Sequence, residues 1–166
     1  MAVRSMSDTE DAMRKYTNLV YGIALTHTAS KADADDVFQD TFLAYHRSDV
    51  KWRDEVHRKA WLIKTAVNMS KRITLSTWYK RTVPIENSEE QSVDFDYGLA
   101  EQNIIMNAIK KLPKKYRCVI WLYYFDGMPV NEIAKAVDMN KNTVRSHLVR
   151  GREMLGKLLE REGISI

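Results

Sequence analysis

The stretch PVNEIAKAVDMNKNTVRSHLVRGREMLGK, residues 129–157, predicts two short helices joined by a tight turn. In the first helix Ile133 and Val137 lie four residues apart and therefore share one face. The corner begins at Asp138, a residue type that tolerates the left-handed backbone such corners often need, though less well than glycine. Asn140 follows and is suited to cap the second helix.

The second helix of this stretch is predicted to be apolar on one side and basic on the other. Its inward stripe consists of Val144, Leu148, Gly151 and Leu155. The opposite side carries Asn142, Ser146, Val149 and Arg150, flanked by Arg145 and Arg152. The pattern is typical of a helix-turn-helix whose second helix enters the DNA major groove. The alternative is an ordinary helical hairpin with a solvated basic face, which the agreement of spacing, turn and charge makes the weaker interpretation.

The whole chain has the composition of a folded, helical protein. Its 166 residues suffice for one domain or two small ones, and the 45% of hydrophobic residues can form a core. Only six glycines and three prolines occur, which favours helices over hairpins. The net charge of +4 is compatible with nucleic-acid binding without proving it.

The sequence gives little support for a membrane protein, an internal disulfide or a metal site. The longest apolar run, Cys118–Phe125, is too short to cross a bilayer, and the N-terminus lacks a basic-then-apolar signal. The one cysteine cannot form an internal disulfide or a zinc site, and the four histidines lack metal-ligand spacing. We therefore expect a cytoplasmic protein without membrane insertion, metal or cofactor.

Two helices are predicted in the first 45 residues. A capping box at residues 7–10 opens the first, and the second runs from Ser30 to about Tyr45. The second exposes an acidic side with Asp35, Asp36, Gln39 and Asp40. Asp36 and Asp40 form a like-charge pair that destabilises the helix by about 0.2–0.5 kcal/mol. This side is either a solvated face or a docking surface for a basic partner.

Between residues 47 and 81 the charge reverses, with ten lysines or arginines against three acids. A third helix is predicted over residues 57–79, with Leu62, Ile63, Ala66, Val67, Met69 and Ile73 inward. Its other side carries Trp61, Lys64, Thr65, Asn68, Lys71 and Arg72. Aromatic rings among cations suit single-stranded nucleic acid, because bases stack on the rings and phosphates meet the cations. The sequence alone places most of the aromatic residues of this region in the core.

The remaining sequence predicts an acidic linker followed by a second helical domain. Residues 84–97 contain five acids and no base. Helices are then predicted over residues 99–112, with Ile104, Ile105, Ala108 and Ile109 inward, and over residues 114–125. The predicted fold is all-α: one domain over residues 1–82, a linker over 83–98, and a helix-turn-helix domain over 99–166.

Three segments together resemble one known family. DADDVFQDTFLAYHR (residues 33–47), KAWLIKTAVNMSKR (59–72) and the run from Ile109 to Leu155 resemble bacterial RNA polymerase sigma factors of the sigma-70 family, in the extracytoplasmic-function (ECF) group. The KLP-x-x-x-R, EIA and TV-R-S-x-L-x-R-x-R runs are specific in combination. The chain departs from the family pattern at Asp138 and Asn142, where glycine is frequent, and at Arg72, where an acid or amide is common.

The resemblance implies a non-catalytic protein that binds core RNA polymerase and directs promoter-specific initiation. It implies contacts with the clamp helices and flap of the large subunits, with promoter DNA, and with an anti-sigma factor. The residues implied for core binding are Asp36, Gln39 and Asp40. Those implied for the −10 element are Trp61, Lys64, Asn68, Lys71 and Arg72. Those implied for the −35 element are Lys141, Asn142, Arg145, Ser146, Val149 and Arg150.

Two other interpretations remain at this stage. A stand-alone helix-turn-helix regulator would bind its operator without polymerase, but no βα alternation typical of a receiver domain is visible. A helical enzyme acting on nucleic acid would need carboxylates clustered around a metal. The only dense cluster, residues 33–40, lacks an accompanying histidine or catalytic lysine pattern.

Overall fold

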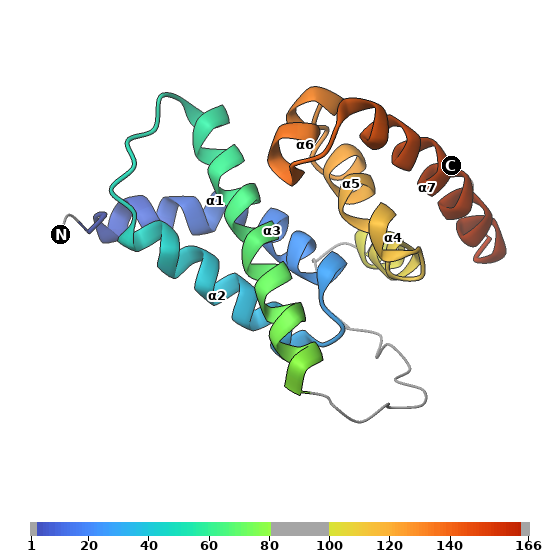
Figure 1. Cartoon of the computed structure of the whole chain (residues 1–166), viewed down its shortest axis with the longest axis horizontal. Coiled ribbons are helices and arrows are strands. Elements are labelled where there is room, and N and C mark those ends of the chain that lie inside the picture. Colours follow the sequence, from blue (N-terminus) through green and yellow to red (C-terminus); the bar gives the residue numbers. More distant parts are fainter. Residues whose placement is uncertain (1–2, 81–99, 164–166) are drawn as a thin grey trace. The chain divides into compact units, whose positions relative to one another are not determined.

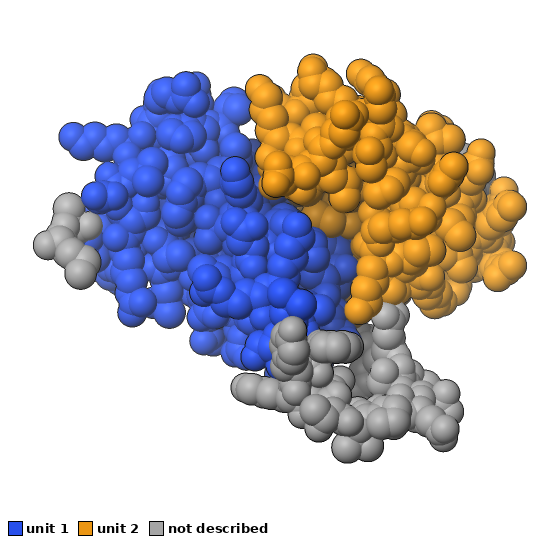
Figure 2. Space-filling model, viewed as in Figure 1, with its two compact units in different colours: residues 1–91 blue, residues 92–166 orange. Residues whose placement is uncertain are grey.

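The computed structural model describes residues 3–80 and 100–163, and these residues form seven α-helices and no strand. They fall into two compact units, residues 1–91 (unit 1) and 92–166 (unit 2), shown in Figure 2. The helices, labelled in Figure 1, are α1 (Met6–His27), α2 (Lys31–Arg47), α3 (Glu55–Lys80), α4 (Ala100–Lys110), α5 (Lys114–Tyr124), α6 (Val130–Val137) and α7 (Lys141–Arg161). The predicted all-α fold is confirmed. The predicted linker over residues 83–98 lies outside the described residues.

The starts of α1 and α2 are set by serine caps. The second helix begins after Ser30, as predicted, and Ser30 caps it by accepting a hydrogen bond from the Asp33 amide at 3.1 Å. The predicted cap of α1 at Ser7 is wrong, because the helix already begins at Met6 and Ser5 accepts from the Asp8 amide at 3.2 Å. Ser5 has the extended backbone that a cap requires, and an acid stands three residues later at either position, so the sequence pattern fits both registers.

Unit 1 is a bundle of α1, α2 and α3 around an apolar core. From α3, Leu62, Ile63, Ala66 and Val67 are buried as predicted, and Met69 and Ile73 are half-buried. They meet Val20, Ile23 and Leu25 of α1 and Val37, Phe42 and Tyr45 of α2. The hydrophobic spacing of each helix thus accounts for its inward face.

Arg58 is a buried cation at the junction of the three helices, with only 4% of its side chain exposed. Its Nε donates to the Tyr45 hydroxyl at 2.8 Å, and Nη1 donates to Asp11 at 2.9 Å and to Glu55 at 3.0 Å. Nη2 donates to a carboxylate oxygen and to the backbone oxygen of Asp8, both at 3.1 Å. One guanidinium therefore joins side chains of α1, α2 and α3, and its planar fork suits these several acceptors.

This network lowers the pKa values of two carboxyl groups. The hydrogen bond from Arg58 holds the pKa of Asp11 below its usual range, and Lys15 adds to the effect. A hydrogen bond from the Tyr16 hydroxyl, reinforced by Arg58, does the same for Glu55. Both groups therefore stabilise the folded unit in their ionised form.

Unit 2 packs α4, α5, α6 and α7 around Ile109, Ile120, Trp121, Ile133, Val144 and Leu155, all of which are buried. The prediction that Ile104 faces inward is wrong: it is 39% exposed, whereas Met106 is buried. At about 100° per residue, Ile104 lies roughly 140° around the helix from Ile109, outside the apolar stripe. Ala108 and Ile109 are buried as predicted, and Ile105 is half-buried.

The KLP-x-x-x-R run forms the corner between α4 and α5. Pro113 occupies the N-cap position of α5, and the buried Arg117 donates from Nε to the Leu112 backbone oxygen at 2.7 Å. This bond satisfies a carbonyl that the end of α4 leaves without a helical partner. The arginine of this run therefore has a structural role.

A glycine lets α5 and α7 approach closely. A Cβ atom added at Gly151 would lie 2.9 Å from Ile120 Cγ1 and 3.2 Å from Tyr116 Cβ. A Cβ added at Gly156, five residues further along α7, would meet nothing within 4 Å. The two glycines of one helix thus differ only in what surrounds them, and they make a matched pair for substitution.

We predict that Gly151→Ala destabilises unit 2 by about 1–3 kcal/mol, because Ile120 and Tyr116 must move apart. Gly156→Ala should instead stabilise it by about 0.5–1 kcal/mol through the higher helix propensity of alanine. Native-state amide hydrogen exchange of α5 and α7 measures both changes in the full chain. Equal effects of the two substitutions would contradict the close packing at Gly151.

We predict that Arg58→Met lowers the free energy of unfolding of unit 1 by an amount near the lower end of about 3–5 kcal/mol. The loss is at the lower end because the three carboxylates left behind keep partial contact with water. Arg47→Met, at the exposed end of α2, is the control and should change stability by less than about 1 kcal/mol. Native-state amide hydrogen exchange of α1, α2 and α3 in the full chain measures the difference, since these helices make up unit 1.

The same pair of variants should differ in pH dependence. Because the folded pKa values of Asp11 and Glu55 lie below their unfolded values, their stabilisation is complete above about pH 5 and is lost as the pH falls through the folded values. Arg58→Met removes the main cause of the shift at Asp11, so its stability should fall less steeply below pH 5. Parallel pH profiles for the variant and the parent chain would contradict this assignment.

Candidate nucleic-acid interface

The corner between α6 and α7 has the geometry of a tight helix-turn-helix. Asp138 adopts the left-handed conformation, with φ 56° and ψ 49°. The Met139 amide donates to the Ala134 backbone oxygen at 2.9 Å, which closes the end of α6 as in a Schellman motif. Asn140 Oδ1 accepts from the Asn142 amide at 2.8 Å and caps α7, as predicted. Aspartate therefore takes the place where glycine is frequent in such corners without changing the turn.

The N-terminal half of α7 presents its polar face to solvent. The six residues predicted to contact DNA are all exposed: Lys141, Asn142, Arg145, Ser146, Val149 and Arg150. Arg145 Nη1 donates to Asn142 Oδ1 at 3.1 Å, so these two side chains are held together on the surface. On the opposite side Val144, Gly151 and Leu155 are buried and Leu148 is half-buried, which matches the predicted inward stripe.

An open hollow of about 550 Å³ lies beside this face, between α6 and the start of α7. Polar and cationic side chains dominate its lining, which includes Asn131, Lys135, Lys141 and Arg145. A surface of this kind suits the phosphate backbone of nucleic acid.

The start of α5 extends the positive surface in a way that sequence reasoning missed. His147 of α7 is half-buried against Tyr116, with ring centroids 5.2 Å apart, and Lys115 lies 5.0 Å from the Tyr116 ring centre. Burial lowers the pKa of His147, and the charges of Lys115 and Arg150 lower it further. The lowered pKa favours the neutral form of His147, so Lys115 and Arg150 supply the positive charge of this region. Lys114 and Lys115 are both exposed at the start of α5, whereas Tyr116 and Arg117 are buried.

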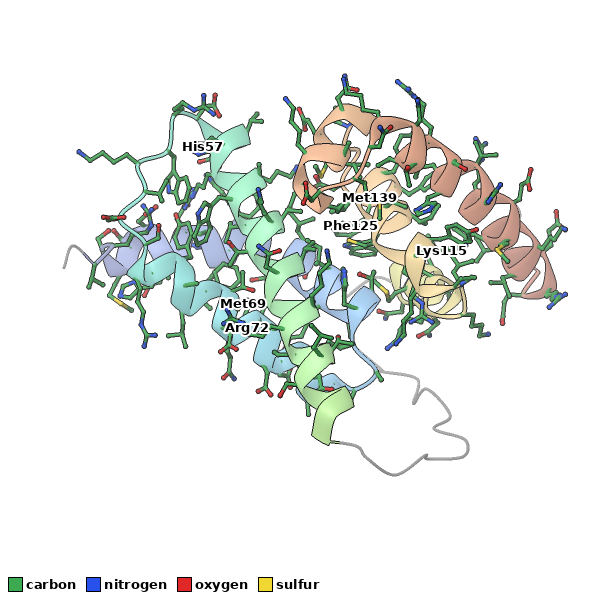
Figure 3. The ribbon with its side chains drawn as sticks, viewed as in Figure 1. His57, Met69, Arg72, Lys115, Phe125 and Met139 are labelled. Carbon is green, nitrogen blue, oxygen red and sulfur yellow. The ribbon has the colours of Figure 1, made fainter. Side chains whose placement is uncertain are left out.

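A second basic face lies on α3 in unit 1. Lys64, Asn68, Lys71 and Arg72 are exposed, as predicted, and Figure 3 labels Arg72 beyond the middle of the helix. The only acid in α3 is Glu55 at its first position, where it hydrogen-bonds to Arg58. The exposed side of α3 beyond its first turn is therefore cationic and polar, with no acid to repel a phosphate.

Trp61 sits at the edge of this face within an aromatic cluster. It is half-buried, and its ring centroid lies 5.5 Å from that of Trp52 and 6.0 Å from that of Tyr45. Trp52 also stacks on Tyr45 at 5.6 Å. Both tryptophans are thus partly core residues and partly accessible, while the side chains of residues 78 and 79 lie outside the description.

An acidic face occupies the exposed side of α2. Asp36, Gln39 and Asp40 are exposed, and neither aspartate belongs to an ion pair within the described part of the chain. Leu43 continues the same stripe one turn further on and is 48% exposed. Sequence reasoning missed Leu43, although its spacing of three and four residues from Asp40 and Gln39 indicates it.

Asp35, by contrast, binds a side chain of the neighbouring helix α1. The Tyr21 hydroxyl donates to its carboxylate, and Tyr21 stacks on Phe38 with centroids 4.6 Å apart. Burial, together with the carboxylate of Asp35, raises the pKa of Tyr21 to about 12. The acidic face available to a partner is therefore Asp36 and Asp40 with Gln39 and Leu43.

Residues 3–80 and 100–163 contain no cluster of three or more histidine, cysteine, aspartate or glutamate side chains with the arrangement of a metal site. None of the helices in these ranges combines the length and hydrophobicity needed to span a bilayer.

Comparison with known families identifies both units. The model of Sigma-70 region 2 matches residues 12–79, and the model of Sigma-70, region 4 matches residues 102–155. The ECF RNA polymerase sigma-E factor of Haemophilus influenzae is 29% identical over 156 residues, which cover 85% of this chain and 82% of that protein. The ECF RNA polymerase sigma factor SigW of Bacillus subtilis is 29% identical over 169 residues, covering 90% of this chain and 87% of SigW.

Solved structures share the fold at lower sequence identity. CnrH in complex with the cytosolic domain of CnrY has a TM-score of 0.63 and 20% identity, covering 95% of this chain and 90% of that one. The sigma factor RpoE in complex with the anti-sigma factor NepR from Bartonella quintana has a TM-score of 0.65 and 20% identity, covering 93% and 98%. At this level of identity the two structures support the fold alone.

Proposed function

The chain belongs to the sigma-70 family, in its ECF group, and from this premise we propose which of its surfaces bind which part of the transcription machinery. As a sigma factor it binds core RNA polymerase and directs promoter-specific initiation of transcription. We propose that it does so by binding alone, with no catalytic step of its own, and that it acts in the cytoplasm, where polymerase and chromosomal DNA are found.

We propose that unit 2 reads the −35 element as duplex DNA. The supporting features are the exposed face of Lys141, Asn142, Arg145, Ser146, Val149 and Arg150 and the tight corner that presents it. A helix of this kind fits the major groove, where arginine can bind guanine O6 and N7 with two hydrogen bonds. Lys115 at the start of α5 is placed to meet the adjacent phosphates.

We propose that unit 1 reads and opens the −10 element. The cationic side of α3 carries Lys64, Asn68, Lys71 and Arg72, and Trp61 stands at its edge. Single-stranded DNA combines phosphates that pair with cations and unstacked bases that pack on aromatic rings. We accordingly propose a −10 domain over residues 1–82, a linker over 83–98 and a −35 domain over 99–166.

The acidic face of α2 is proposed as the docking surface for the clamp helices of core polymerase, with the flap as a second contact. Asp36 and Asp40 are exposed and form no ion pair among the described residues, an arrangement that a basic partner would stabilise. We also propose control by an anti-sigma factor. Of the two structures that share the fold, RpoE is in complex with the anti-sigma factor NepR, and CnrH is in complex with the cytosolic domain of CnrY.

The observation that carries the proposal is that each unit exposes one basic helix face, without acids among residues 141–150 of α7 or beyond the first turn of α3, and that unit 1 also exposes an acidic face on α2. Transcription in vitro with purified core polymerase and a promoter library tests it. We expect selection of a −35 and a −10 element together, and the absence of any transcript above the level of core polymerase alone would contradict the proposal.

The −35 assignment predicts different effects for two cations of α7. Arg150→Ala should lower promoter binding by about 1–3 kcal/mol and relax the preference at one base pair, because a bidentate base contact is lost. Arg150→Lys should not restore that preference, since lysine lacks the planar fork. Arg150 forms no ion pair with Glu153 within the described residues, so its guanidinium is available.

Lys157→Ala is the matched control, because Lys157 lies nearly two turns beyond Arg150 on the same helix. It should weaken binding to all −35 variants equally and reduce the salt dependence by about one unit, as expected for a phosphate contact. Binding of polymerase reconstituted with each variant to a set of −35 sequences measures both effects. If Arg150→Ala weakened every sequence equally, Arg150 would be at most a phosphate contact.

The docking assignment predicts that the double variant Asp36→Lys, Asp40→Lys binds core polymerase at least about tenfold more weakly, because like charges then meet across the interface. The fold should be unchanged, since both side chains are exposed and unpaired. Glu10→Lys, on the exposed side of α1, reverses one charge outside this face and is the control, which should bind normally. Competition for core polymerase against the parent chain measures the difference, and parental affinity of the double variant would exclude this surface.

A further inference from the structure

Arg4 precedes α1 by two residues and is nearly buried, with 11% of its side chain exposed. Its Nε donates to the Tyr45 backbone oxygen at 3.0 Å, and Nη2 donates to the Val50 backbone oxygen and to Ser48 Oγ, the latter at 3.5 Å. Its backbone amide also donates to the His46 oxygen at 3.0 Å. One residue at the start of the chain thus holds the end of α2 and the segment that follows it.

The guanidinium of Arg4 also lies against two aromatic rings. Its Cζ is 4.7 Å from the ring centre of Tyr45 and 4.4 Å from that of Trp52, which is within the range of cation–π attraction. Nη1 pairs with Asp8 at 3.3 Å. Asp8 also receives hydrogen bonds from Arg58, so removal of Arg4 would not leave that carboxylate without a partner.

The segment held by Arg4, residues 48–54, connects α2 to α3. Its second half is anchored separately: Asp54 Oδ1 accepts from the His57 amide at 2.8 Å, and the Arg53 amide donates to His57 Nδ1 at 3.2 Å. Its first half is held by Arg4, by the Ser48 amide, which donates to the Tyr45 backbone oxygen at 3.2 Å, and by the local bond of the Val50 amide to Ser48 Oγ at 3.1 Å. Without Arg4, this half would keep the Ser48 amide bond and the stacking of Trp52 on Tyr45, but it would lose the guanidinium contacts to Val50, to Ser48 and to the Trp52 ring.

This segment adjoins the surface proposed to bind the −10 element. Lys51 and Arg53 are exposed on either side of Trp52. The Trp52 ring packs edge-to-face against Trp61 at 5.5 Å and against His57 at 5.4 Å. The chain of contacts therefore runs from Arg4 through Trp52 to Trp61. Lys51 and Arg53 flank Trp52 in the sequence, so the same contacts position them.

We infer that Arg4 is a positioning residue for −10 recognition: it fixes the 48–54 segment and Trp52 so that Trp61, Lys51 and Arg53 form one preformed surface for unstacked bases and phosphates. The inference rests on the proposed role of α3 in binding the −10 strand. Arg4 itself is nearly buried, so it acts on DNA binding only by positioning these residues. A surface already ordered before binding loses less conformational entropy on binding and selects bases more sharply.

The inference predicts that lysine cannot replace Arg4. A lysine would keep the charge beside Asp8 and the aromatic rings, but one ammonium cannot span the acceptors on Tyr45, Ser48 and Val50 together. Arg4→Lys should therefore fall between the parent chain and Arg4→Ala. Arg14→Ala removes an equal charge from an exposed position of α1 and is the matched control.

The test uses the full chain with core polymerase and a promoter set that differs at single −10 positions. Strand opening is measured by the fluorescence of a base analogue in the −10 strand, at saturating polymerase. We expect Arg4→Ala to reduce the preference between the best and the mismatched base by at least about fivefold, the loss expected for one base contact. Binding to core polymerase should match the parent chain, and amide exchange should rise at residues 48–52 while α2 stays protected.

Asn68→Ala and Trp61→Ala serve as separate variants for the proposed function. If these two leave −10 preference unchanged, α3 does not read the −10 strand, and the role of Arg4 fails with it. If they reduce the preference while Arg4→Ala leaves it unchanged or lowers opening equally on every sequence, the −10 surface stands and the inference about Arg4 is wrong.

Discussion

Unit 1 depends on one buried guanidinium. Arg58 donates to Tyr45, Asp8, Asp11 and Glu55 and so ties three helices together at a point where the apolar core ends. A charge taken out of water is destabilising unless its partners satisfy all its donors, and here they do. Arg58 and its acids pair with one another inside unit 1, whereas Lys64, Lys71 and Arg72 are exposed on α3 and belong to no ion pair among the described residues. This division between internal and external charge is the reason for proposing the exposed side of α3 as a binding surface.

Unit 2 is held together by close packing of its helices. Gly151 lets α7 lie close against Ile120 and Tyr116, and the left-handed Asp138 turns the chain sharply enough for α6 to cover the same core. With Val144 and Leu155 anchored inward, Arg145, Ser146, Val149 and Arg150 must face outward. The rigidity of this arrangement matters for function, since base recognition requires side chains held within a fraction of an ångström of productive geometry.

The sequence predicted what local periodicity determines. The apolar spacing of α3 and α7 identified their buried faces, and Asn140 was identifiable as a cap because its role involves only residues two positions away. It misplaced the cap of α1, because Ser5 and Ser7 each precede an acid at the required spacing, and it turned Ile104 inward. It did not reveal Arg58 or Arg4, several of whose partners lie about 40 to 50 residues away, because a count of charges cannot tell a buried arginine from a solvated one.

The central claim is that the −35 and −10 surfaces, which lie in separate units, read a promoter together only when both are bound to core polymerase. Footprinting of one promoter by the chain with and without core polymerase, over a range of salt concentrations, tests it most directly. The account predicts weak, salt-sensitive and sequence-independent binding by the free chain, and protection of both elements with opening at −10 by the complex. A tight, sequence-specific footprint over both elements by the chain alone would contradict it.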